Sequence, residues 1–228
     1  MRLIRFIITA GLLSGVLSAC AGGGDGGSAS DSNSSASTGV RLIHAALEAA
    51  PLQIFSSTNP AQPVQQARFG QETLYAPLKT GAQVLNLSVA TQPANVIGTA
   101  ALTVERNQRY SLLLYGDYTH LGLSTALVLD KPPQLSKDSS ALRCMHAASG
   151  AGQLSIEIDD MPLEQAIEFG SSSEYATIDA GLHTILAKRA ADGLVLYSGQ
   201  ITTAGRNPYT LVIGGETGLL IVGQLYHG

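Results

Sequence analysis

Two histidines occupy equivalent positions in a short segment that occurs twice, and an imidazole can bind a metal or transfer protons near neutral pH. Residues 40–46 (VRLIHAA) return as residues 142–148 (LRCMHAA), so His44 recurs as His146. The five histidines of the chain form neither a His-x-His nor a His-Glu-x-x-His spacing, so the sequence predicts no metal site and no cofactor. We expect each ring to hydrogen-bond backbone groups at a strand end, with a shared ligand or metal site, or catalysis, as the alternatives.

Arg41 and Arg143 recur in the same segment, three residues before each histidine. Recurrence in both copies favours a structural role, because a duplicated scaffold repeats the residues that hold it together. We expect each arginine to pack its aliphatic stem on a sheet and to place its guanidinium on carbonyls or on a carboxylate.

The remaining polar clusters predict no catalytic residue. Asp159 and Asp160 follow an apolar run and are expected to form a hairpin turn, with a calcium site as the alternative. The serines at 171–173 are expected in a loop, and no Gly-x-Ser-x-Gly elbow is present. Cys144 stands where Leu42 stands in the first copy, so we predict a small buried hydrophobe there. The sequence therefore favours a protein that is not an enzyme.

Further landmarks recur about a hundred residues apart and predict a tandem of one module. They are a Phe-Gly pair, a Tyr-Ala pair, a glycine and an Arg-Asn pair, at 69–70, 75–76, 81 and 106–107 and again at 169–170, 175–176, 181 and 206–207. We predict two domains, residues 40–133 and 134–228. Lys131-Pro132-Pro133 marks the boundary, since proline cannot continue a β-ladder.

Short apolar runs separated by turn residues recur about every ten residues, as expected for β-strands. The sequence predicts an all-β protein of two tandem immunoglobulin-like antiparallel β-sandwiches. Tyr110 and Tyr209 each follow a polar turn and open an apolar run, which resembles a tyrosine corner, whose hydroxyl bonds an upstream backbone group. The Cys…Trp…Cys core of immunoglobulin domains is absent, so the expected likeness is architectural.

The repeated pattern also resembles the bacterial family of domains of unknown function numbered 4397. That pattern opens with Arg-x-x-His-Ala and carries Phe-Gly, Tyr, an apolar-x-Gly step and a late Gly-x-x-Tyr-Thr strand. Residues 40–54 and 142–158 carry the opening, and residues 204–210 carry the late strand with a turn one residue longer. The first copy departs from it with Ser111 in place of Thr, and the second lacks a counterpart of Pro51. The resemblance implies a secreted or envelope sandwich domain and supplies no catalytic residues.

Residues 1–19 read as a lipoprotein signal peptide. Arg2 and Arg5 precede an apolar run at 6–16, which is too short to span a bilayer. Leu17-Ser18-Ala19-Cys20 then resembles the bacterial lipobox. An ordinary secretory leader with a chance cysteine is the alternative.

The lipobox resemblance implies cleavage before Cys20 and attachment of lipid, palmitate included, to that residue as a membrane anchor. Ala21 follows where Asp would retain a Gram-negative lipoprotein in the inner membrane, so the resemblance implies the outer membrane if the source is Gram-negative. Residues 20–39 are dominated by Gly and Ser and are expected to form a flexible tether.

The formal net charge of −4, with no basic stripe, excludes nucleic acid as an expected partner. We predict a non-enzymatic, lipid-anchored envelope protein that acts as an adhesive, scaffolding or partner-binding module on envelope proteins or glycans. The alternatives are a glycan- or small-ligand-binding lipoprotein and, third, a hydrolase whose site no motif reveals. A concave patch bearing an exposed tyrosine among polar groups would favour ligand binding, and Tyr118 with His120 is the expected exposed pair in the first module.

Overall fold

The computed structural model describes residues 38–47, 49–59, 63–117, 122–216 and 219–226. These residues form strands and turns, so the all-β prediction is confirmed. The described segments include no helix long and apolar enough to cross a membrane. The predicted signal peptide, Cys20, most of the tether, Tyr118 and His120 lie outside the described residues.

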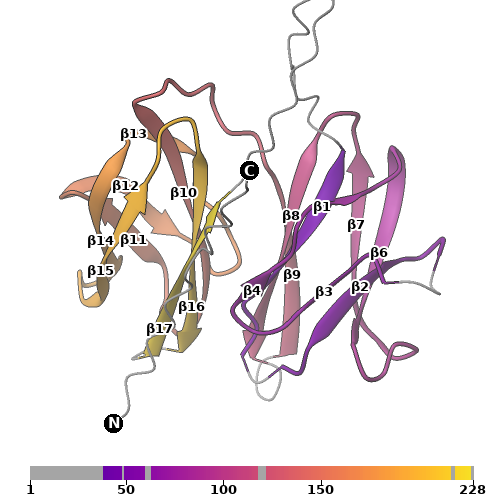
Figure 1. Cartoon of the computed structure of the whole chain (residues 1–228). Helices are drawn as coiled ribbons and strands as arrows, with labels where there is room; N and C mark the ends of the chain where they lie inside the picture. Colours follow the sequence, from indigo (N-terminus) through magenta and orange to yellow (C-terminus); the bar gives the residue numbers. More distant parts are fainter. Residues whose placement is uncertain (1–37, 48, 60–62, 118–121, 217–218, 227–228) are drawn as a thin grey trace, which may run out of the picture. The chain divides into compact units, whose positions relative to one another are not determined.

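Among the described residues, nine strands form in the first half of the chain and eight in the second. Figure 1 shows how they are arranged. The first nine are β1 (Gly39–His44), β2 (Leu52–Ser56), β3 (Gln65–Ala67), β4 (Gln71–Glu72), β5 (Ala76–Pro77), β6 (Gly81–Val89), β7 (Val96–Val104), β8 (Arg109–Asp117) and β9 (Gly122–Leu129). The others are β10 (Ser139–Ser149), β11 (Leu154–Ile158), β12 (Met161–Ile167), β13 (Ala176–Asp179), β14 (Gly181–Arg189), β15 (Val195–Thr203), β16 (Pro208–Glu216) and β17 (Leu219–Tyr226).

Each half contains two sheets with the same strand order. In the first half, sheet A runs β4-β1-β8-β9 with β5 also paired to β1, and sheet B runs β3-β2-β6-β7. In the second half, sheet C runs β13-β10-β16-β17 and sheet D runs β12-β11-β14-β15. The opening strand of each half therefore lies at the centre of a sheet, where both of its edges are paired.

The strand pairing departs from the predicted antiparallel, immunoglobulin-like sandwich in one respect. The opening strands β1 and β10 pair in parallel with β8 and β16, and all other pairs are antiparallel among the described strands. The first two strands of an immunoglobulin constant domain share a sheet, whereas β1 and β2 lie in different sheets here. Because the chain passes from sheet A to sheet B between β1 and β2, these two strands do not form a hairpin, and β1 takes β8 as its parallel neighbour.

The opening strands are buried on both faces. Val40 and Leu42 belong to the core of the first half, whereas Ile43 and Ala45 belong to a separate apolar cluster with Met145, Ala147 and Val212 of the second half. This alternation follows from the period of two of a β-strand. It places Arg41 on the face that meets the second half.

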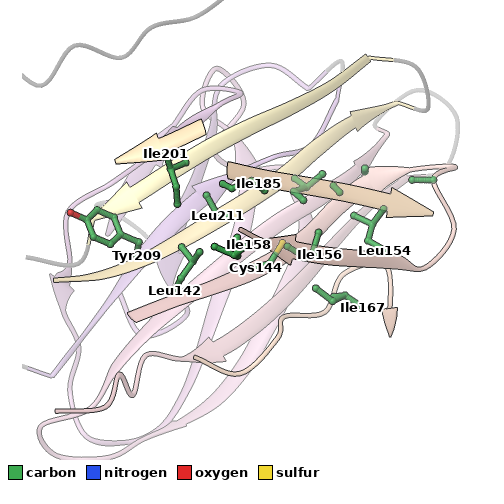
Figure 2. Packing of buried hydrophobic residues seen from close by; sticks show 14 residues of the cluster. Leu142, Cys144, Leu154, Ile156, Ile158, Ile167, Ile185, Ile201, Tyr209 and Leu211 are labelled. Atoms are coloured by element: carbon green, nitrogen blue, oxygen red, sulfur yellow. The ribbon is translucent and has the colours of Figure 1, made fainter. Parts of the chain in front are cut away.

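The core of the second half confirms the prediction for Cys144. Figure 2 shows its side chain among Leu142, Ile156 and Leu211, with none of its surface exposed. Desolvation raises the pKa of the thiol far above its usual range. Since the thiolate is the reactive form, this cysteine serves as packing.

The hairpin predicted at Asp159 and Asp160 is also confirmed. The two residues join β11 to β12, and both have positive φ angles, 49° and 65°. A two-residue loop with left-handed backbone at both positions matches the twist of the flanking strands, and aspartate tolerates it well.

Candidate functional site

Arg41 on β1 is the first of two buried arginines that recur in the repeat. Only 1% of its surface is exposed, and its Nε donates to Ser111 Oγ at 2.7 Å. Its Nη1 donates to Glu72 Oε2 at 2.9 Å, and its Cζ lies 5.3 Å from the centroid of the Tyr75 ring. Desolvation raises the pKa of the Glu72 carboxyl, while Arg41 acts in the opposite direction.

Arg143 on β10 has an equivalent hydroxyl and an equivalent ring beside it in the second half. It is 2% exposed, and its Nε donates to Thr210 Oγ1 at 3.0 Å, the position equivalent to Ser111. Its Cζ lies 4.7 Å from the centroid of the Tyr175 ring, the counterpart of Tyr75. The repeated arginine and the repeated tyrosine of the sequence pattern are therefore stacked on each other in both halves.

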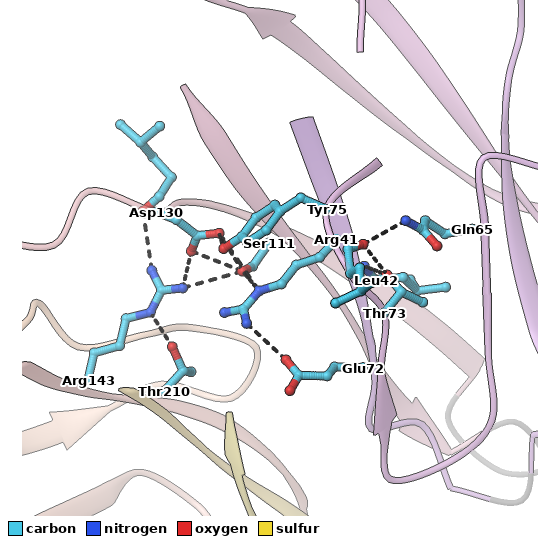
Figure 3. A network of polar contacts seen from close by, with 12 residues as sticks. Arg41, Leu42, Gln65, Glu72, Thr73, Tyr75, Ser111, Asp130, Arg143 and Thr210 are labelled. Carbon is cyan, nitrogen blue, oxygen red and sulfur yellow. Dashed lines mark hydrogen bonds and ion pairs between the residues drawn. The ribbon is translucent and has the colours of Figure 1, made fainter. Parts of the chain in front are cut away.

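Asp130 joins the two arginines into one network, drawn in Figure 3. Its Oδ1 accepts a hydrogen bond from Arg143 Nη2, and its Oδ2 lies 3.9 Å from Arg41 Nε. The Ser111 and Tyr75 hydroxyls also donate to this carboxylate, each at 2.7 Å to Oδ2. The Asp130 side chain is only 2% exposed.

Formal charges balance in this network, since Arg41 and Arg143 face Asp130 and Glu72. Buried charges are tolerated when each is paired and hydrogen-bonded, and removing one partner is costly. The network therefore acts as a clamp that depends on residues from both halves of the chain and on Asp130 of the linking segment, residues 130–138 between β9 and β10.

Sequence reasoning treated the two arginines as separate and missed Asp130. Asp130 directly follows β9, and the equivalent position after β17 in the second half carries His227, so the carboxylate does not recur in the repeat. The one available signal was its position, directly before Lys131-Pro132-Pro133 and between two segments that each carry a repeated arginine.

Both recurring histidines are bonded to backbone at the ends of their strands. His44 Nδ1 accepts from the Ala46 N–H at 3.3 Å, and its Nε2 lies 3.4 Å from the Ala50 carbonyl oxygen. His146 repeats this arrangement, with the Ala148 N–H at 3.2 Å from Nδ1 and the Gly152 carbonyl oxygen at 2.7 Å from Nε2. An accepting Nδ1 with a donating Nε2 is the arrangement of a neutral imidazole. Burial lowers the pKa of both rings, in keeping with that neutral form.

Each histidine also meets the aromatic ring of the recurring Phe-Gly pair. Edge-to-face contacts join His44 to Phe69 at 6.3 Å and His146 to Phe169 at 5.6 Å between ring centroids. The recurring histidine and phenylalanine therefore contact each other inside each half, whereas the two recurring arginines meet at Asp130.

Tyr110 and Tyr209 have the hydrogen bonds of a tyrosine corner. The Tyr110 hydroxyl accepts from the Glu105 N–H at 3.1 Å and donates to the Thr103 carbonyl at 3.2 Å. The Tyr209 hydroxyl accepts from the Ala204 N–H at 2.9 Å. Both hydroxyls thus fix the turn that precedes β8 or β16.

His183 and Asp159 form a pair that sequence reasoning did not anticipate. His183 Nδ1 lies 2.6 Å from Asp159 Oδ2, and its Nε2 lies 2.8 Å from the Asp179 carbonyl oxygen. The pair borders a cavity of about 420 Å³. Because both ring nitrogens face oxygen acceptors, neither is available to activate a nucleophile in this arrangement. Within the described part of the chain, no group of three or more His, Cys, Asp or Glu could hold a metal ion.

A second cavity, of about 350 Å³, borders the clamp. It is lined by β9, by the linking segment and by residues 172–175 of the second half, and Arg143 contributes to its wall. Lys131, Glu174 and the partly exposed ring of Tyr175 are also in this lining. This cavity combines the ring of Tyr175 with charged and hydroxyl groups.

Comparison with known families gives one match, to the family described as Domain of unknown function (DUF4397), over residues 38–157. That range holds the first half and the opening two strands of the second. The comparison with curated proteins gave no match.

Several solved structures share a distant likeness. One is from a study of α-glucan recognition by family 41 carbohydrate-binding modules of streptococcal virulence factors (10% identity, 82% of this chain and 96% of that chain, TM-score 0.28). Another is a family 26 module of Eubacterium rectale Amy13K in complex with maltoheptaose (12% identity, 82% of this chain and 96% of that chain, TM-score 0.27). A third is the fimbrial anchor protein Mfa2 of Porphyromonas gingivalis (10% identity, 83% of this chain and 97% of that chain, TM-score 0.25). Likenesses of this size do not assign a function to the chain.

Proposed function

The chain belongs to the DUF4397 family, and we propose that it is a non-enzymatic, lipid-anchored protein of the bacterial cell envelope that binds an envelope partner. One observation carries this proposal: Arg41, Arg143, His44 and His146, which recur in both halves, are buried and bonded within their own fold. The recurring polar side chains therefore support the scaffold, and we expect an envelope partner to contact the exposed surface.

Two tandem sandwich modules, residues 40–133 and 134–228, form the scaffold in this proposal. The identical strand order of the two halves supports it, as does the separate apolar core of each. The Asp130 clamp and the apolar cluster around Ile43 and Met145 then hold the modules as one unit. A rigid two-module unit on a Gly/Ser tether suits presentation of a binding surface away from a membrane.

The anchor is tested by Cys20→Ala. We expect this variant to take up no radiolabelled palmitate and to retain its leader, because the proposed acylation and cleavage both require the Cys20 sulfur. Cys144→Ala is the matched control, since these are the two cysteines of the chain and Cys144 is fully buried. Equal labelling of wild type and Cys20→Ala would rule out the anchor.

Partner binding is tested in intact cells with a photo-crosslinking residue at Leu74, Met161 or Leu182, three exposed apolar positions. A specific partner contacts one surface, so we expect one envelope component to crosslink from one or two of these positions and not from all. A crosslinker at buried Leu113 is the control. Identical products from every exposed position, or none, would contradict a specific partner.

A second candidate function, binding of a glycan or another small ligand, is favoured by the 350 Å³ cavity beside Arg143. Ligand sites combine an apolar or aromatic wall with a few placed polar groups. The ring of Tyr175 among Lys131, Ser172 and Glu174 meets that description.

A further inference from the structure

Ser172 in the second half occupies the backbone position that Glu72 occupies in the first. Glu72 pairs with Ile43 in an antiparallel ladder, and Ser172 forms an antiparallel bridge with Met145, the counterpart of Ile43. The next residues agree, because the Thr73 and Ser173 hydroxyls each accept from an N–H of the opening strand at 2.9 Å. The two halves can therefore be compared position by position here.

The comparison shows that the two arginines differ in one partner. Arg41 Nη1 donates to the carboxylate of Glu72. The side chain of Ser172 carries no carboxylate, and Arg143 Nη1 donates instead to the Leu129 carbonyl at 3.2 Å. A guanidinium has five N–H groups. Thr210, Leu129, Asp130 and Ser111 account for four of those of Arg143, so among the described residues one Nη1 hydrogen is left for a ligand.

A ligand in the cavity can accept a hydrogen bond from this Nη1 hydrogen of Arg143. Arg143 and the Ser172 position both line it, so it includes the side of Arg143 that corresponds to the Glu72 side of Arg41. Its charged lining residues are Lys131, Arg143 and Glu174, and Asp130 already pairs with Arg143, so these formal charges cancel. Arg143 Nη1 and the Lys131 ammonium can receive one carboxylate, whereas Glu174 disfavours a second.

The other lining groups indicate what the rest of the ligand carries. Ser172 and Glu174 can hydrogen-bond hydroxyl groups, and the partly exposed ring of Tyr175 can pack against an apolar ring face. A cavity of 350 Å³ is at the small end of ligand sites. It therefore suits one sugar-sized ring rather than a long chain.

We infer that this cavity binds a hydroxylated monocarboxylate of the uronic acid class, with its carboxylate on Arg143 in the position that Glu72 takes on Arg41. This inference rests on the second candidate function and names its ligand class. The carboxylate accepts from Arg143 Nη1 and lies near Lys131, while the ring hydroxyls bond Ser172 and Glu174.

Calorimetric titration of the full mature chain with D-glucuronate, D-glucose and acetate tests the ligand class. We expect saturable binding of glucuronate, at least tenfold weaker binding of glucose, which lacks the carboxylate, and weaker binding of acetate, which lacks the ring. Glucose binding as tight as glucuronate would overturn the acidic class and leave small-ligand binding standing. If none of the three compounds binds, the inference is overturned. The anchor and crosslinking experiments test the envelope role separately.

The location is tested by Ser172→Glu, which supplies the cavity with the carboxylate that the first half already has. We expect this variant to stay folded and to bind glucuronate at least tenfold more weakly, because its own side chain occupies Arg143. Ser171→Glu is the matched control, since it adds the same charge at an exposed neighbour outside the lining, and it should bind as wild type does.

Lys131→Ala gives an independent reading, because Lys131 is exposed and its loss leaves the fold intact. We expect it to weaken glucuronate binding several-fold. Wild-type affinity in a folded Ser172→Glu protein, or in Lys131→Ala, would overturn the assigned site.

Discussion

Asp130→Asn is expected to lower the free energy of unfolding by about 3–5 kcal/mol, the usual cost of removing one partner from a buried ion pair. The substitution keeps the shape of the side chain but removes the charge that faces Arg41 and Arg143. The carboxylate of Glu72, which contacts Arg41, is then the one negative charge left in the network, and it faces two buried guanidiniums. Urea denaturation followed by circular dichroism measures the change.

Asp138→Asn is the matched control, because Asp138 lies in the same linking segment but its side chain is 81% exposed, with Oδ2 at 4.0 Å from Lys137 Nζ. Its loss should change the free energy of unfolding by less than about 0.5 kcal/mol. The clamp would be refuted if Asp130→Asn cost no more than this control.

The same substitution also tests how the two halves are joined. Arg143 belongs to the second half and Arg41 to the first, so the clamp couples their unfolding. We expect wild type to unfold in one transition, and Asp130→Asn to show a lower midpoint and a loss of coincidence between tyrosine fluorescence and circular dichroism.

The sequence predicted those parts of the fold that local patterns control. The apolar run that precedes Asp159 forms the strand Leu154–Ile158, because apolar and polar side chains alternate through it. The edge strands β3, β4, β5 and β12 were missed, since the first three are only two or three residues long and β12 contains a proline and no regular alternation of apolar and polar residues. Parallel pairing of β1 with β8 was also missed, because no local pattern encodes the direction of a partner distant in the chain.

The residues of the candidate site likewise include some that the sequence identifies and some that it does not. Recurrence alone singled out Arg41 and Arg143, because both copies of the module keep them. The residues that make the site distinctive are those that do not recur: Asp130 lies in the linking segment, and Ser172 replaces Glu72. A repeat pattern cannot identify them, since their importance arises from the differences between the copies and from contacts formed only after folding.

Acidification below about pH 6.5 is expected to destabilise the fold through His44 and His146. Desolvation lowers the folded-state pKa of both rings from their usual value of 6.5, and Glu168 opposes this shift at His146. The unfolded chain therefore binds protons first, so the stabilisation is present above pH 6.5 and is lost as the pH falls toward the folded-state pKa values. Each histidine contributes a slope of up to roughly 1.4 kcal/mol per pH unit, and the pair up to roughly 2.7.

Free energies of unfolding measured by urea denaturation between pH 7.5 and 5 test this, and the quantity to compare is the slope rather than the absolute stability. His44→Gln and His146→Gln each replace a titrating ring by an amide that still offers a donor and an acceptor. Each single variant should therefore lose part of the slope, and the double variant should lose most of it. The carboxyl of Asp159, whose pKa is lowered first by its hydrogen bond to His183, loses its contribution at lower pH and should not affect this range. A double variant with the wild-type slope would show that the acid sensitivity arises elsewhere and that the two recurring rings are not held neutral by the fold.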